Sequence, residues 1–126
     1  MGSLIDGKAV AAAVKNDVRT RVTALRARGV VPGLATVLVG DDPASQVYVR
    51  NKQRACEDVG MRSFGHRLVA TTSRADLLRL LASLAENGEV HGILVQLPLP
   101  NGLDANEVIR ALPPAKDVDG LHPMNQ

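Results

Sequence analysis

The regular alternation of short apolar runs with longer amphipathic segments is the feature of this sequence that most constrains its fold. The runs Leu34–Val39 and Val90–Leu97 have the length of strands and are almost wholly apolar, as strands buried on both faces are. Met61–Leu68 is a weaker, more polar candidate strand. Such alternation predicts right-handed β-α-β crossovers. The expected fold class is therefore α/β: a single domain with three layers, α/β/α, and a mostly parallel sheet of three to five strands.

Helices are predicted by amphipathic periodicity together with residues that favour helix ends. Valines recur four residues apart in the first predicted helix, and polar or proline residues suited to a helix start precede the others. The expected helices are Lys8–Arg28, a helix that starts at Asp42 or Ser45 and runs to Val59, a leucine-rich helix from Ser73 to Asn87, and a short helix from Asp104 to Pro113.

Composition excludes several classes of partner. The 126 residues suffice for one domain with a core. Charge is nearly balanced, with 15 Lys plus Arg against 13 Asp plus Glu, and Tyr48 and Phe64 are the only aromatic residues, so nucleic-acid binding is not expected. No apolar run reaches the roughly 18 residues that span a bilayer, and no membrane partner is expected. The single cysteine, Cys56, and the absence of a signal-peptide pattern favour a cytoplasmic protein.

A parallel sheet also predicts where a ligand binds. Ligands of such sheets lie beyond the carboxyl ends of the strands. This rule directs attention to three segments that carry polar residues: Gly40–Ser45, Gln96–Pro100, and the residues from Lys116 to Gly120.

Ser45, Tyr48 and Lys52 form one stripe of the second predicted helix, at positions i, i+3 and i+7. A tyrosine offers a flat face for a planar heterocycle and a hydroxyl for hydrogen bonding. A lysine that loses hydration is a source of neutral amine for proton transfer. The alternative is a solvated helix face with a half-buried tyrosine, and the spacing alone favours that alternative.

Gln96 interrupts the apolar run at the point where the strand is expected to leave the sheet. An amide in that position needs hydrogen-bond partners. The amide could bind a ligand, or it could hold the following loop in place through hydrogen bonds. The sequence does not decide between these two roles. Leu97 and Pro98 open a proline-rich loop stiff enough to form a pocket wall.

Near the end of the chain, Asp117 and Asp119 stand two residues apart. In an extended segment both point the same way, so that one could bind a ligand's N–H groups while the other pairs with Lys116. A charged surface loop is the alternative.

Signals for a metal or a dinucleotide are missing. His66, His91 and His122 have no partners at metal-ligand spacing, so no metal is expected. No Gly-x-Gly-x-x-Gly loop follows a predicted strand, and the carboxylates of Asp41 and Asp42 would repel a phosphate.

Three ungapped stretches resemble the signatures of a known family. They are Val39–Lys52 (VGDDPASQVYVRNK), Gly92–Pro100 (GILVQLPLP) and Pro114–Leu121 (PAKDVDGL). Together they resemble the bifunctional methylenetetrahydrofolate dehydrogenase/cyclohydrolase family, in the family's order, and the resemblance extends from Leu4 to about Asn125.

This resemblance implies a folate site. Tyr48 would stack on the pterin, Gln96 would hold the central catalytic Lys52, and the carboxylate of Asp119 would hold the pterin's amino edge. The implied catalytic residues are Lys52, Tyr48 and Gln96, and the implied substrate-binding residues are Ser45, Tyr48, Gln96, Leu97, Pro98 and Asp119.

The family's reactions are oxidation of 5,10-methylenetetrahydrofolate with NADP and hydrolysis of the methenyl product to 10-formyltetrahydrofolate. We expect residues 1–126 to be the tetrahydrofolate-binding catalytic domain, without the NADP-binding Rossmann domain, and the full-length family to form homodimers. The resemblance does not remove two alternatives: a stand-alone folate-binding module without catalysis, and an unrelated α/β domain that serves as an interaction partner.

Overall fold

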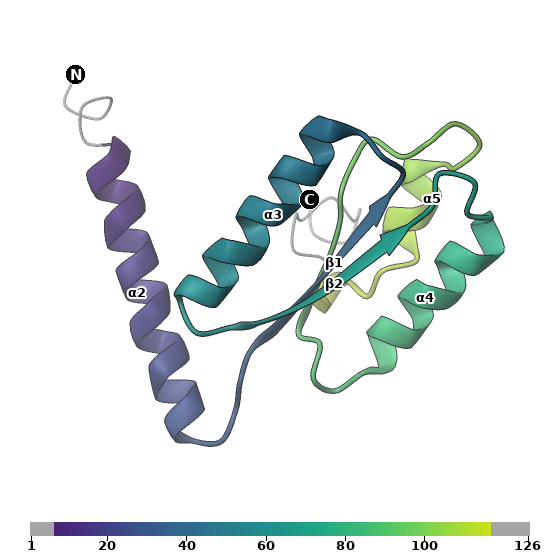
Figure 1. Cartoon of the computed structure of the whole chain (residues 1–126). Helices are drawn as coiled ribbons and strands as arrows, with labels where there is room; N and C mark the ends of the chain where they lie inside the picture. Colours follow the sequence, from purple (N-terminus) through teal and green to yellow (C-terminus); the bar gives the residue numbers. More distant parts are fainter. Residues whose placement is uncertain (1–6, 117–126) are drawn as a thin grey trace.

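β1 is the central strand of a parallel sheet and is buried along its whole length. The computed structural model describes residues 7–116, with side chains from residue 15 onward. In this part of the chain the strand order is β2-β1-β3, and both neighbours pair with β1 in parallel (Figure 1). The elements are α2 (Gly7–Ala27), β1 (Gly33–Val39), α3 (Pro43–Asp58), β2 (Arg62–Leu68), α4 (Arg74–Glu86), β3 (Gly92–Val95), α5 (Ala105–Arg110) and the 3-10 turn η1 (Pro114–Lys116).

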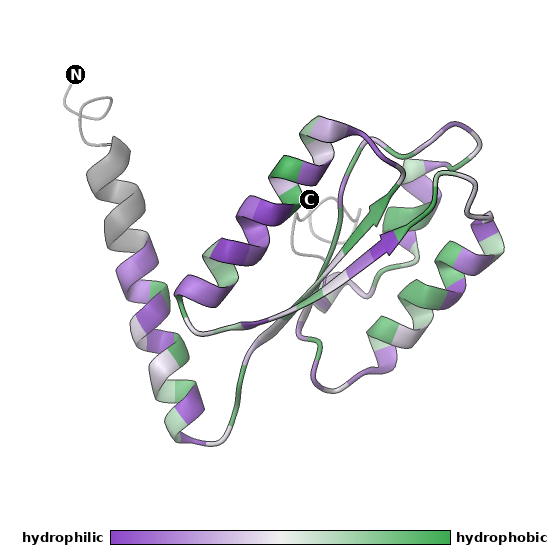
Figure 2. Cartoon of the chain, viewed as in Figure 1, coloured by the Kyte–Doolittle hydropathy of each residue, from purple (hydrophilic) through white to green (hydrophobic). Residues whose placement is uncertain are grey.

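Alternate residues of β1 serve the two faces of the sheet. On one face Ala35, Val37 and Val39 pack with leucines of α4 and with Val108 of α5. On the other face the buried cluster consists of Leu34, Cys56 of α3 and Leu94, with Met61 at its margin. Figure 2 shows the hydrophobic β1 beside the more hydrophilic β2, which forms one edge of the sheet. The predicted three-layer α/β/α architecture is confirmed.

Helix starts follow the local chemistry that the sequence indicates. The Asp42 carboxylate accepts a hydrogen bond from the backbone N–H of Ser45 at 3.0 Å, and Pro43 occupies the first turn of α3. In α4 the Ser73 hydroxyl accepts from the backbone N–H of Asp76 at 3.1 Å. Both predicted helix starts are therefore confirmed.

β3 is shorter than predicted. The apolar run Val90–Leu97 indicated a strand of that length, whereas the strand covers Gly92–Val95. Hydrogen bonds to β1 continue one residue beyond each end, from the N–H of His91 and from the N–H of Gln96 to Val37 at 2.9 Å. Beyond Gln96 the pairing ends at Pro98, which has no N–H to donate and follows a cis peptide bond.

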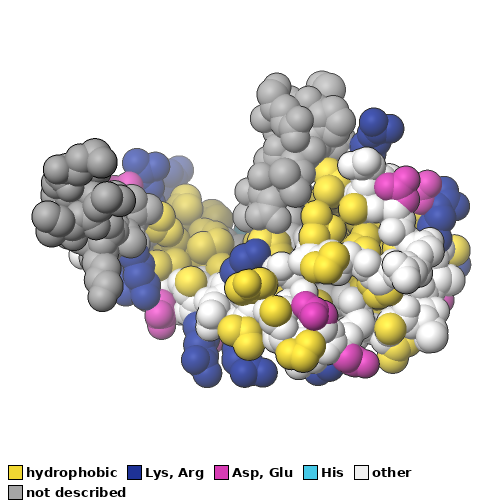
Figure 3. Space-filling view, turned by 90° about the horizontal axis from the view of Figure 1, so that it is seen from above, with side chains coloured by type: hydrophobic (Ala, Val, Ile, Leu, Met, Phe, Trp, Pro, Cys, Tyr) yellow, Lys and Arg dark blue, Asp and Glu magenta, His cyan; other side chains and the backbone are white. Residues whose placement is uncertain are grey.

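The end of the molecule toward which the strands point carries exposed apolar side chains. Figure 3 looks down on this end and shows hydrophobic side chains at its surface among charged ones. Val47 and Tyr48 lie near the start of α3, and Val69 follows β2. All three are at least 48% exposed. A ligand at the carboxyl edge would therefore meet apolar as well as polar surface.

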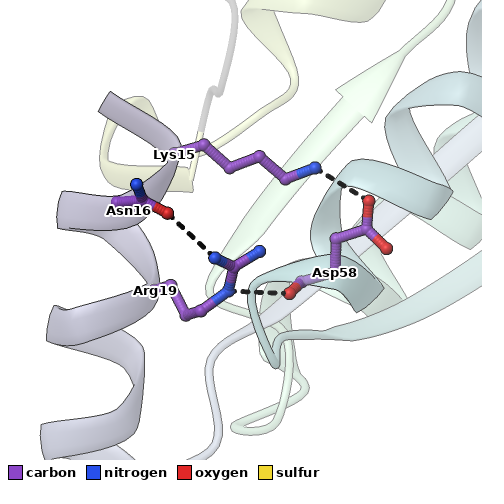
Figure 4. A network of polar contacts seen from close by, with 4 residues as sticks. All are labelled: Lys15, Asn16, Arg19 and Asp58. Carbon is purple, nitrogen blue, oxygen red and sulfur yellow. Dashed lines mark hydrogen bonds and ion pairs between the residues drawn. The ribbon is translucent and has the colours of Figure 1, made fainter. Parts of the chain in front are cut away.

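α2 is joined to the end of α3 by polar contacts (Figure 4). Lys15 Nζ lies 2.9 Å from Asp58 Oδ2, and Arg19 Nε donates to the Asp58 carbonyl at 3.2 Å. The hydrogen bond from Lys15 lowers the pKa of the Asp58 carboxyl. These side chains are exposed, so each contact contributes little to stability. In residues 7–116 no helix, α2 included, is long and apolar enough to cross a membrane.

We expect Leu81→Ala to lower the free energy of unfolding by about 2–5 kcal/mol, because it leaves a cavity in a close-packed core. Leu81 is 1% exposed and belongs to the cluster between α4 and the sheet. Urea denaturation followed by circular dichroism measures the change. Ser83→Ala, at an exposed position of the same helix, is the control and should alter stability by less than about 0.5 kcal/mol. Similar effects of the two substitutions would contradict this assignment of the core.

Candidate active site

Lys52 and Gln96 meet although 44 residues separate them. Lys52 Nζ donates to Gln96 Oε1 at 3.0 Å, and Gln96 Nε2 donates to the Leu97 carbonyl at 3.0 Å. These two partners set the orientation of the amide, because the ammonium requires an acceptor and the carbonyl requires a donor. Gln96 is 9% exposed, whereas Lys52 is only partly buried. The amine is thus held in place and still reaches solvent.

Sheet topology explains this meeting. α3 follows β1, and Gln96 follows β3, the neighbour of β1 in the sheet. Because parallel strands end at the same edge, the segments Gly40–Ser45 and Gln96–Pro100 converge there, as predicted. A pocket of about 210 Å³ lies between them, and it is lined by Val39, Gly40, Asp41, Asp42, Ala70, Pro98, Leu99 and Pro100.

Gly40 shapes this pocket. Its φ of 99° lies in the left-handed region, where a side chain is strained. A Cβ at this position would also lie 3.4 Å from Pro100 Cγ. Glycine therefore allows the chain to turn from β1 into α3 close to the proline loop.

Tyr48 lies on α3 one turn before Lys52, and it is 55% exposed. This exposure fits the half-buried tyrosine of a solvated helix face as well as a ring that faces a ligand. An exposed phenol ring beside an ordered amine offers a flat surface to a planar ligand.

Ser45 is 1% exposed, so its hydroxyl lies inside the start of α3. The hydroxyl donates to Asp42 Oδ2 at 2.7 Å, and the backbone N–H of Ser45 donates to the same oxygen. These contacts stabilise the helix N-terminus. The substrate-binding role of Ser45 stays a prediction.

Lys116 does not lie at the carboxyl edge of the sheet, where its segment was expected, and its predicted pairing with Asp117 or Asp119 involves residues outside the described part of the chain. Its Nζ donates to the carbonyls of Ala85 at 2.8 Å and Asn87 at 3.2 Å, at the C-terminal end of α4. Because α4 runs back from the carboxyl edge of the sheet, this lysine lies near the amino ends of the strands. A cation is favoured there by the unpaired carbonyls of the helix end. Asp119, the predicted pterin-binding carboxylate, lies outside the described residues.

The sequence reading missed one polar contact beneath α3. Gln53 Nε2 donates to Thr36 Oγ1 at 3.0 Å, and Thr36 is 0% exposed. A signal was available, since Thr36 is the one polar residue of the run Leu34–Val39. A cavity of about 290 Å³ lies on this flank of α3, and neither this cavity nor the 210 Å³ pocket is lined by Lys52 or Gln96.

Cys56 is a core residue, as the sequence favoured. It lies one turn beyond Lys52, is 9% exposed and packs with Leu34 and Leu94. Burial, and to a smaller extent the charge of Glu57, raises the pKa of its thiol. Cys56 is therefore unsuited to act as a nucleophile.

The described residues do not fit a metal or a dinucleotide phosphate. Among residues 7–116 no three His, Cys, Asp or Glu side chains lie together as metal ligands would. His91 Nδ1 instead accepts from the backbone N–H of Gly33 at 3.0 Å. The N-terminus of α3, where a pyrophosphate would bind in a dinucleotide fold, is already occupied by the Asp42 carboxylate.

Comparisons with known proteins agree with this geometry. A family model described as tetrahydrofolate dehydrogenase/cyclohydrolase, catalytic domain, matches residues 5–119. Bifunctional protein FolD 2 of Geobacter metallireducens is 53% identical over 125 residues, which are 99% of this chain and 44% of that protein. Bifunctional protein FolD of Magnetococcus marinus is 56% identical over 126 residues, with the same two coverages. The chain spans less than half the length of these relatives.

Solved structures show the same similarity. The bifunctional FolD methylenetetrahydrofolate dehydrogenase/cyclohydrolase of Campylobacter jejuni superposes with a TM-score of 0.93 and 42% identity, over 95% of this chain and 43% of that one. The N5,N10-methylenetetrahydrofolate dehydrogenase-cyclohydrolase of Trypanosoma brucei, complexed with NADP cofactor and inhibitor, gives 0.88 and 38%, over 94% and 40%.

We expect iodoacetamide to alkylate Cys56 at least about tenfold more slowly in the folded chain than in the urea-unfolded chain near pH 8, because only the thiolate reacts and burial disfavours it. The rate in the folded chain should rise with pH as the thiolate forms. Mass spectrometry of samples quenched over time measures both rates. Equal rates in the two states would show that the thiol is accessible.

Proposed function

The chain belongs to the tetrahydrofolate dehydrogenase/cyclohydrolase family, and on that premise we propose that it binds tetrahydrofolate derivatives and hydrolyses 5,10-methenyltetrahydrofolate to 10-formyltetrahydrofolate. One observation carries the proposal: the Lys52 amine is held by the Gln96 amide at 3.0 Å, one helix turn from the exposed ring of Tyr48. These are the residues that the family resemblance assigns to catalysis, and two segments distant in sequence bring them together.

Lys52 would move protons in the proposed hydrolysis. Water adds to the methenyl carbon, and the bond from that carbon to N5 then breaks. One proton of the water ends on N5 and the other leaves to solvent, which balances the positive charge of the methenyl substrate. An amine oriented by Gln96 is suited to accept the proton of the attacking water and deliver it to N5.

Gln96 differs from a carboxylate in its effect on the amine. It accepts a hydrogen bond from the amine and so fixes its direction, and it brings no charge of its own next to the amine. The neutral partner therefore suits a lysine that must both take up and release a proton.

Tyr48 would place the substrate. Its ring lies on the same helical stripe as Lys52, so a pterin stacked on it would bring the reacting carbon close to the amine. Leu97 and Pro98, in the loop beside Gln96, would form the wall of the site. The roles of Ser45 and Asp119 in binding rest on the family resemblance.

Oxidation of 5,10-methylenetetrahydrofolate with NADP is proposed for this chain only in combination with a dinucleotide-binding domain. The curated relatives are bifunctional, and the chain covers 44% of their length. The described residues do not fit the phosphates of NADP, since Asp42 fills the N-terminus of α3. We therefore assign residues 1–126 to the folate-binding half of such an enzyme. Cytoplasmic location and homodimeric assembly of the whole enzyme belong to the same proposal.

A folate-binding module without catalysis is the second candidate, favoured by the same partial coverage of the relatives. Calorimetry with a folate analogue and a hydrolysis assay on the same preparation distinguish the two. Binding without turnover would identify the module.

We expect Lys52→Met to reduce hydrolysis of 5,10-methenyltetrahydrofolate by at least about 100-fold, because it removes the proton-transfer group. Affinity for a folate analogue should change by less than about threefold, since the stacking surface remains. Loss of methenyl absorbance and calorimetry measure the two effects. Arg54→Met, which removes an exposed cation from the same helix, should leave both unchanged. Full turnover by Lys52→Met would refute the assignment.

Tyr48→Ala should weaken binding of a folate analogue by about tenfold, within the range of 1–3 kcal/mol that aromatic stacking contributes. Tyr48→Phe keeps the ring, so its dissociation constant should stay within about twofold of the unsubstituted chain. Calorimetry provides both constants. Equal affinities of the Ala and Phe variants would show that the ring does not stack on the ligand.

A further inference from the structure

Two consecutive residues of α3 make hydrogen bonds to two different parts of the sheet. Lys52 reaches Gln96, just beyond the end of β3, and Gln53 reaches Thr36 in the middle of β1. Both bonds are 3.0 Å long and at least partly buried. These contacts therefore hold α3 at two separate points, one beyond the end of β3 and one on the neighbouring strand β1.

Thr36 is fully buried beneath α3, so its hydroxyl needs a hydrogen-bond partner. Thr36 is 0% exposed, and Gln53 is the side chain that bonds to it. Gly65 is the β2 residue paired with Thr36 in the sheet register. A Cβ on Gly65 would lie 2.6 Å from Gln53 Nε2, so the missing side chain makes room for the amide.

Apolar contacts fix the position of α3 along the sheet less sharply than a hydrogen bond does, because burial of apolar surface is not directional. Val49 and Cys56, the buried apolar residues of this helix, would tolerate small shifts. A hydrogen bond does not tolerate them. A slip of one residue moves a helix by about 1.5 Å and turns it by about 100°, which would break the bond from Gln53 to Thr36.

We propose that Gln53 is a positioning residue for Lys52. The hydrogen bond from Gln53 to Thr36 fixes the placement of α3, and this placement keeps Lys52 Nζ within hydrogen-bond distance of Gln96 Oε1. The missing side chain of Gly65 leaves room for the Gln53 amide. Gln53 acts through the helix and through its neighbour in sequence. The expected effect of Gln53 on kcat rests on the proposed function. The effect of Gln53 on the position of the Lys52 amine does not rest on it, because that position can be measured without folate.

Two substitutions of Thr36 separate hydrogen bonding from packing. Thr36→Val keeps the shape and removes the oxygen, whereas Thr36→Ser keeps the oxygen and removes a methyl group. If the hydrogen bond positions Lys52, the kcat of Thr36→Val for methenyl hydrolysis should fall about tenfold, while its KM stays within about threefold of that of the unsubstituted chain. The kcat of Thr36→Ser should stay within about twofold of that of the unsubstituted chain. If Thr36 acts only by packing, the order of the two variants reverses, which would overturn the proposal.

Gln53→Met and Gly65→Ala test the same bond without altering the buried threonine. Gln53→Met removes the amide, and Gly65→Ala displaces it. Each should lower kcat by about tenfold, as Thr36→Val does. Gln46→Met is the matched control, because this glutamine also lies on α3 but its amide binds the backbone carbonyl of Asp41. It should leave kcat unchanged.

NMR of the lysine side chains, with the Lys52 signal assigned from Lys52→Met, reports the placement of the amine directly. We expect the Lys52 Nζ signal to shift in Gln53→Met, Gly65→Ala and Thr36→Val, and to stay in place in Thr36→Ser and Gln46→Met. An unshifted signal in folded Gln53→Met would overturn the proposal whatever the kinetics. Absence of turnover in the unsubstituted chain would refute the proposed hydrolysis, and the NMR comparison would still decide the role of Gln53.

Discussion

Complete burial of β1 is the constraint on which the rest of the structure depends. A strand with no exposed residue needs a hydrogen-bonding partner on each edge and a packed layer on each face. β2 and β3 satisfy the edges, and α3 and α4 cover the faces. The requirement also extends to side chains, because the buried hydroxyl of Thr36 needs a hydrogen-bond partner. Gln53 of α3 provides it by donating a hydrogen bond to the hydroxyl oxygen.

The same constraint places the candidate site. Because the neighbours of β1 run parallel to it, the start of α3 and the loop after β3 meet at one edge. There the Asp42 carboxylate binds the start of α3, the position that a phosphate takes in dinucleotide-binding sheets. What remains at this edge is an exposed aromatic ring, an oriented amine and a rigid loop. This combination suits a planar heterocycle with a carbon open to attack by water.

Much of the fold follows from short stretches of sequence. The run Leu34–Val39 predicted β1 to within one residue, and Asp42 and Ser73 predicted two helix starts. These features are local, because they depend on residues within a few positions of one another. The end of β3 was predicted less well, since an apolar run continues into the loop where Pro98 stops the hydrogen bonding.

By itself, the sequence determined the fold class, the stripe that holds Tyr48 and Lys52, and the family resemblance. Only the tertiary structure decided that Lys52 meets Gln96, that Gln53 meets Thr36, and that Lys116 binds the end of α4. The partners in these contacts are 44, 17 and 31 residues apart. Whether such residues touch depends on how each helix is rotated and seated on the sheet. Packing of the whole domain sets that rotation, and no local pattern of residues contains it.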